Sequence, residues 1–180
     1  FLTRRQIVDR GSIPSTAWKT DGTAPGSHAV AALPSGHANP WDWREGAQGA
    51  EAFYFAWSDL EHGRELWATD GTVAGTGLAA DIEPGQESSS PWQLRTVGDQ
   101  VIFRAGTAGA GLELWQVDGG FPTAQPVADL YPGIESSAPL MLGTTDEALY
   151  FLADDGVVGR EISQVRWAAV ARCMAHGTTL

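Results

Sequence analysis

Short apolar segments alternate with polar, turn-forming stretches along the chain. In its central part these segments predict four strands, at residues 91–97, 100–105, 112–117 and 125–130. Gly, Pro, Asp and Ser separate the segments, as is typical of sheets built from strands of about 5–6 residues. Helical periodicity is absent, except that residues 166–175 fit a short helix as well as they fit a last strand. The pattern therefore predicts an all-β fold.

This strand pattern recurs with a period of about 48 residues. The Glu-Leu-Trp strand at 65–67 stands again at 113–115, and degenerate copies stand at 16–18 and 161–163. Asp-Gly dipeptides follow the first three of these strands, and they favour turns that need a positive φ. We interpret the repeated Trp and Asp positions as structural, with each Trp filling the space between adjacent sheets. These positions are Trp18, Trp67 and Trp115 in the strands and Asp21, Asp70 and Asp118 in the turns.

Four antiparallel strands in each unit of this length are typical of the blades of a β-propeller. We expect residues 1–165 to form a propeller of about four blades, or a partial propeller, and residues 166–180 to form a C-terminal strand or tail. The first unit lacks the stretch that precedes its hydrophobic strand near Ile7, so one blade is incomplete. Two alternatives follow, which are a closed ring of four blades and a part-ring completed by a partner.

The repeated motif resembles the bacterial ELWxxDGT repeat family. The match is densest over residues 63–103, which contain Glu-Leu-Trp, Asp-Gly-Thr, Asp-Ile-x-Pro-Gly and Ser-Ser-x-Pro elements. It extends with losses over residues 7–162, since Gly120 replaces the Thr of the motif and Ser163 replaces the Trp. The resemblance implies a propeller-like fold in an exported or surface-associated bacterial protein. It supplies no catalytic residues.

Charge and composition exclude several classes of function. The net charge of −11, with Lys19 as the single lysine, argues against nucleic acid as a partner, because phosphate backbones are bound by Lys and Arg. Cys173 is the only cysteine, so an internal disulfide is excluded. No apolar run reaches the roughly 18 residues of a transmembrane helix. The chain begins with Phe1, which suggests that a signal peptide or a longer precursor precedes it.

Acidic side chains offer the main candidates for chemistry. The repeated Glu65, Glu113 and Glu161 are expected to be structural, accepting backbone N–H bonds at a sheet edge or turn. Asp154 and Asp155 are the candidate ligands for calcium, a cation that binds carboxylate and carbonyl oxygens. The histidines lack the spacing of a zinc site, and the motifs of hydrolases and phosphate-binding loops are absent. We therefore expect no cofactor and no enzymatic activity.

Three functions remain open at this point. The first is a non-enzymatic scaffold or binding module that docks onto a larger protein assembly or a cell-surface structure. The second is a carbohydrate-binding module, since exposed aromatic rings stack on sugars, and the third is a fragment of a propeller enzyme. The candidate ligand-binding residues of the second are Trp41, Trp43, Trp57 and Trp92.

Overall fold

A computed structural model describes residues 2–5, 13–36, 46–117, 123–145 and 148–166. These residues form antiparallel β-sheets, and they contain no helix. The all-β prediction is therefore confirmed, and no helix in the described ranges is long and apolar enough to cross a membrane. The strands are β1 (Leu2–Arg5), β2 (Ile13–Lys19), β3 (His28–Gly36), β4 (Gly46–Gln48), β5 (Phe53–Asp59), β6 (Gly63–Thr69), β7 (Thr76–Ala80), β8 (Trp92–Val97), β9 (Gln100–Thr107), β10 (Gly111–Val117), β11 (Ala124–Ala128), β12 (Leu140–Thr144), β13 (Ala148–Asp154) and β14 (Arg160–Arg166).

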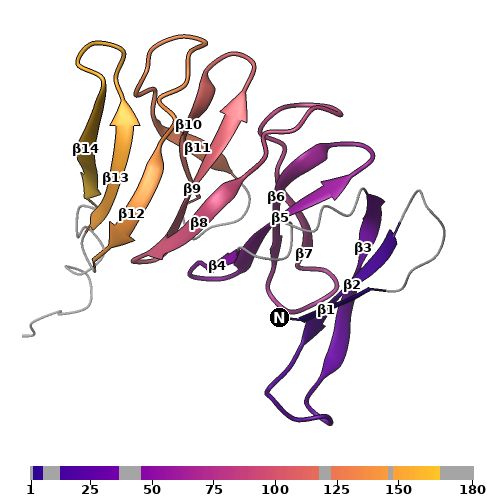
Figure 1. Ribbon diagram of the computed structural model, residues 1–180. Helices are drawn as coiled ribbons and strands as arrows, with labels where there is room; N and C mark the ends of the chain where they lie inside the picture. Colours follow the sequence, from indigo (N-terminus) through magenta and orange to yellow (C-terminus); the bar gives the residue numbers. More distant parts are fainter. Residues whose placement is uncertain (1, 6–12, 37–45, 118–122, 146–147, 167–180) are drawn as a thin grey trace, which may run out of the picture.

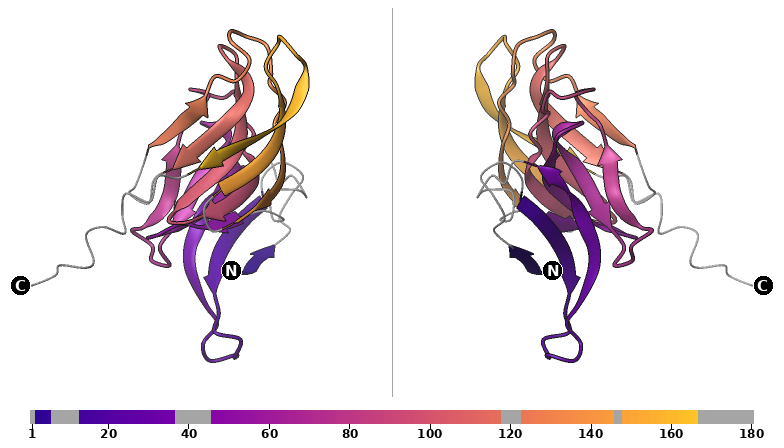
Figure 2. Two further views of the ribbon diagram at one scale, coloured as in Figure 1. Left: turned by 90° about the vertical axis from the view of Figure 1, so that its left-hand side faces the viewer. Right: turned by 90° about the vertical axis from the view of Figure 1, so that its right-hand side faces the viewer.

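The strands make four sheets, which we call A to D in chain order. Sheet A has the order β1-β2-β3, sheet B β4-β5-β6-β7, sheet C β11-β10-β9-β8 and sheet D β12-β13-β14. The four strands predicted between residues 91 and 130 are the four strands of sheet C. The sheets stand in a row, with A and D at opposite ends, and the β2–β3 hairpin extends away from the rest (Figures 1 and 2). They do not close into a ring, so the structure shows stacked sheets and not a closed propeller.

Strand pairing is the same at equivalent positions of successive sheets. Phe55 pairs with Trp67 in sheet B, and Phe103 pairs with Trp115 in sheet C. A register shift lies just before the Trp in both sheets, and the one between Ala17 and Trp18 in sheet A matches it. In each case the extra residue lies in the strand that pairs with the Trp-bearing strand, at Val30, Ala79 and Val127.

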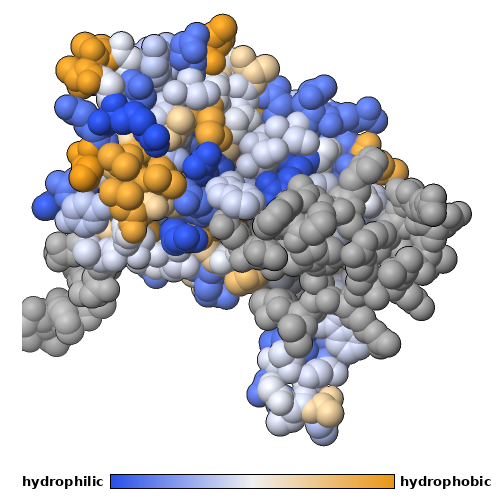
Figure 3. Space-filling model, in the orientation of Figure 1, coloured by the Kyte–Doolittle hydropathy of each residue, from blue (hydrophilic) through white to orange (hydrophobic). Residues whose placement is uncertain are grey.

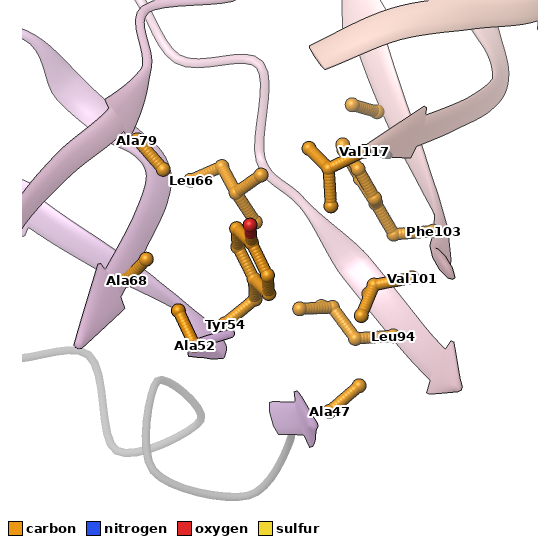
Figure 4. Close-up of a cluster of buried hydrophobic side chains, with 11 residues drawn as sticks. Ala47, Ala52, Tyr54, Leu66, Ala68, Ala79, Leu94, Val101, Phe103 and Val117 are labelled. Carbon is orange, nitrogen blue, oxygen red and sulfur yellow. The ribbon is translucent and has the colours of Figure 1, made fainter. Parts of the chain in front are cut away.

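The core lies between the sheets. We call the face that a sheet turns to the next sheet in the chain its forward face, and the opposite face its back face. Between B and C, Tyr54 and Leu66 of the forward face of B pack against Leu94, Val101 and Phe103 of the back face of C (Figure 4). All five side chains are almost completely buried. Apolar burial of this kind is the main stabilising contribution to such a fold.

The next contact repeats this arrangement 48 residues later. Ile102 and Leu114 of the forward face of C pack against Leu149 and Phe151 of the back face of D. Between A and B, a smaller cluster joins Leu33 of A to Trp57 and Trp67 of B. Each sheet after the first therefore covers the forward face of the sheet before it.

Two of the repeated Trp residues, Trp67 and Trp115, belong to these contacts. Trp67 is 5% exposed in the A–B cluster, and Trp115 is half-buried against the B–C cluster. Trp18 is half-buried on sheet A and belongs to none of the clusters between the described sheets, so the position predicted for it between two sheets is not seen among the described residues. The indole N–H groups of all three are shielded from solvent and have no hydrogen-bond acceptor among the residues described here. Apolar contact therefore holds the rings of Trp67 and Trp115.

Trp67→Ala is expected to lower the free energy of unfolding by about 3–5 kcal/mol, because it leaves a cavity between sheets A and B. Val73→Ala is the control, since Val73 is 72% exposed in the turn after β6, and it should change stability by at most about 0.5 kcal/mol. Chemical denaturation of both variants provides the measurement. Equal midpoints would contradict the packing role of Trp67.

Candidate functional site

A buried carboxylate ties sheet B to the loop that leads to sheet C. Glu65 has no solvent exposure, and its Oε1 accepts a hydrogen bond of 2.7 Å from the Ser89 N–H. Its Oε2 accepts bonds from the Ser89 hydroxyl at 2.5 Å and from the Ile82 N–H at 3.0 Å. Burial raises the pKa of Glu65, and these hydrogen bonds oppose that rise.

The same clamp occurs between sheets C and D. Glu113 is 2% exposed and accepts bonds from the Ser137 N–H at 2.9 Å, the Ser137 hydroxyl at 2.7 Å and the Leu130 N–H at 3.2 Å. These hydrogen bonds agree with the structural role expected for Glu65 and Glu113. Glu161, the equivalent residue of sheet D, is exposed.

The Asp-Gly-Thr turns are held by hydrogen bonds from their own backbone and Thr hydroxyl groups to the Asp carboxylate. Asp70 Oδ1 accepts bonds from the Thr72 hydroxyl at 2.7 Å and the Thr72 N–H at 2.8 Å, and these bonds lower the pKa of Asp70. The Thr72 hydroxyl in turn accepts a bond from the Gly75 N–H, where a Cβ would lie within 2.2 Å of the Asp70 carboxylate. Asp21 makes the equivalent bonds in sheet A, and Asp118 lies outside the described residues.

The candidate calcium ligands have the same kind of role in the β13–β14 hairpin. Asp155 Oδ1 accepts the N–H groups of Val157 and Val158, both at 2.9 Å, and these bonds lower its pKa. Asp154 accepts the N–H of Gly156 at 2.8 Å. No group of three or more Asp, Glu, His or Cys residues that could hold a metal occurs within the described ranges.

The β5–β6 hairpin of sheet B carries the one histidine–carboxylate contact among the described residues. Asp59 is 7% exposed and accepts bonds from the N–H groups of Glu61 and His62. His62 Nδ1 lies 2.9 Å from Asp59 Oδ2. This hydrogen bond raises the pKa of His62. Burial alone would raise the pKa of Asp59, but its hydrogen bonds with His62 and Glu61 hold that pKa below its usual value.

A shallow depression lies beside this hairpin, lined in part by Asp59, Arg64 and Gln86. Arg64 donates a bond of 2.7 Å to the Pro91 carbonyl, and Gln86 donates one of 3.2 Å to the Leu60 carbonyl. The polar groups of Asp59, Arg64 and Gln86 are thus used in hydrogen bonds with neighbouring backbone groups, and they do not form a recognisable set of catalytic residues.

The tryptophans expected to bind ligand are not gathered in one place. Trp57 is 4% exposed and donates a bond of 3.3 Å to the Pro34 carbonyl, so the structure places it in the core and not on a sugar-binding surface. Trp92 is half-buried at the start of β8 in sheet C. Trp41 and Trp43 lie outside the described residues.

The structure instead reveals an apolar surface on the forward face of sheet D. Tyr54 and Leu66 in sheet B and Ile102 and Leu114 in sheet C are at most 1% exposed, because the next sheet covers them. The equivalent residues of sheet D are Tyr150 and Ile162, which stand 48 residues after Ile102 and Leu114. Their side chains are 37% and 69% exposed.

Neighbouring side chains extend this surface. Leu140 pairs with Leu152, which pairs with Ile162, and Leu140 is 37% exposed. Figure 3 shows apolar side chains gathered over sheet D. A contiguous exposed apolar surface marks an interaction site more often than isolated exposed residues do. We call this surface the D face, defined by Leu140, Tyr150, Leu152 and Ile162.

Sequence reasoning missed the D face, although Tyr150 and Ile162 occupy two columns whose earlier members are apolar. No family model, curated protein or solved structure matches this chain. The described residues form stacked antiparallel sheets, and none of the described sheets covers the D face.

Glu65→Gln is expected to lower the free energy of unfolding by about 2–3 kcal/mol. The NH₂ group of the buried glutamine would point at the backbone N–H groups that now donate to the carboxylate, so donors would face each other. Glu161→Gln is the matched control at the equivalent position of sheet D, where the side chain is exposed. It should change stability by at most about 0.5 kcal/mol. Urea denaturation measures both, and the clamp is excluded as a stabilising contact if the two variants lose the same amount.

The contact between Asp59 and His62 should make stability depend on pH. The folded pKa of His62 is raised, so its contribution is present below about pH 6.5 and is lost as the pH rises through the folded value. The pKa of Asp59 in the folded state is lowered, so its contribution to stability is present above about pH 4 and is lost as the pH falls through the folded pKa.

His62→Ala tests this contact, because Ala110 stands at the equivalent position of sheet C. The variant should lose at most about 1 kcal/mol at pH 5.5, since the imidazole is partly exposed. The loss should shrink by pH 8.5, as read from melting temperatures at the two pH values. A loss that is the same at both would show that protonated His62 does not stabilise the hairpin.

Proposed function

We propose that this chain is a non-enzymatic β-repeat scaffold, built from propeller-type blades, that binds another protein through the D face. The observation that carries the proposal is the exposure of Tyr150 and Ile162 at positions that are buried in sheets B and C. Burying one aliphatic side chain is worth about 1.5–3 kcal/mol, so covering this face can supply the affinity of a stable complex. The side chains that define the D face are apolar, and the exposed Arg160 and Arg166 lie on the same side of β14 at its two ends, as a polar rim surrounds the apolar centre of many protein interfaces.

The acidic groups support a structural role over a catalytic one. Glu65, Glu113 and Asp70 each accept hydrogen bonds from their own loops, and the contact of Asp59 with His62 lies within a single hairpin. A glycan-binding function would depend on Trp41 and Trp43, which lie outside the described residues, and on the half-buried Trp92. Export from a bacterial cell stays part of the proposal on the strength of the motif resemblance.

A photoreactive benzoylphenylalanine placed at position 162 tests this function in the cells that make the chain. Ile162 is exposed on the D face, so ultraviolet light should link position 162 to a protein partner. The same residue at position 73, which is equally exposed on a turn remote from the D face, is the control and should give no adduct. A folded chain that yields no protein adduct at 162, or equal adducts at both positions, would contradict the proposal.

A further inference from the structure

We infer that the D face binds the back face of sheet A in a second copy of this chain, so that the copies associate head to tail. This inference rests on the proposed function and names its partner. It starts from the way in which forward faces are covered within the chain.

Both large contacts between sheets join a forward face to the back face of the next sheet. Phe103 covers the Tyr54 and Leu66 pair, and Phe151 covers the Ile102 and Leu114 pair. The surface that fits the D face is therefore the back face of another sheet of the same kind. Such a partner would make the same kind of contact that joins sheet B to sheet C and sheet C to sheet D.

Sheet A carries a back face that no other described sheet covers. Along β3 its forward-face residues, such as Ala31 and Leu33, are buried, whereas Ala29 and Ala32 are exposed. Trp18, which pairs with Ala29, is half-buried. Trp18 and Ala29 stand 49 residues before Trp67 and Leu78, which belong to the contact that sheet B makes with sheet A.

The positions of the two faces make the contact intermolecular. Sheets A and D lie at opposite ends of the row, so the two faces of one chain do not meet (Figure 1). Because the faces differ, the contact is heterologous and each copy offers one donor and one acceptor surface. Such a contact either closes into a ring of copies or extends into a longer array.

Sedimentation of the purified chain and of three variants tests the inference. Ile162→Arg blocks the D face, Ala29→Arg blocks the back face of sheet A, and Val73→Arg is the control on an exposed turn. The wild type and the control should associate as concentration rises. Each blocking variant should associate at least tenfold more weakly with an unchanged melting temperature.

Mixing the two blocked variants gives the decisive result. The intact D face of Ala29→Arg can bind the intact sheet A of Ile162→Arg, so an equimolar mixture should form a complex of two chains. If Ala29→Arg alone associates as the wild type does, the D face pairs with itself and the inference is overturned.

Two further outcomes would also overturn it. One is a wild-type chain that stays monomeric up to about 100 μM. In that case, crosslinks from position 162 to a different protein would leave the proposed function standing. The other is a monomer that Ile162→Arg destabilises, which would show that a segment of the same chain covers the D face.

Discussion

A carboxylate without solvent exposure would be costly in this fold if it did not have three hydrogen-bond donors around it. Glu65 receives them from Ile82 and Ser89, which lie 17 and 24 residues further along the chain. Both donors belong to the connection between β7 and β8, so the clamp determines where sheet C begins relative to sheet B. The packing of Tyr54 and Leu66 against sheet C depends on that placement.

The buried carboxylate clamp occurs in sheets B and C of the described structure, and sheet D differs because its equivalent carboxylate is exposed. Glu113 places sheet D over sheet C in the same way, whereas Glu161 is exposed and the D face beyond it is uncovered. The proposed function follows from this difference between sheet D and sheets B and C. In a stacked repeat, each unit buries its apolar face against a neighbour, so an apolar face that no described sheet covers is suited to binding a partner.

Much of this architecture could be predicted from the sequence, because its determinants are local. The strand pattern placed all four strands of sheet C, and the Glu-Leu-Trp spacing indicated that Glu65 and Glu113 serve the fold. The orientation of individual side chains could not be predicted as well. Leu94 reaches the core through a bulge between Trp92 and Arg95, while Leu142 in the corresponding strand of sheet D is exposed. The burial of Trp57 likewise depends on how sheet A lies against sheet B.

Amide hydrogen exchange in the native protein tests the central claim most directly, because loop amides are protected only where they are stably bonded. The amides of Ile82, Ser89, Leu130 and Ser137 lie outside the strands, yet they donate to Glu65 and Glu113. We expect all four to exchange as slowly as the amides of the central strands β6 and β10. Exchange at the rate of an unstructured peptide would contradict the account, since the clamps would then not hold the sheets together.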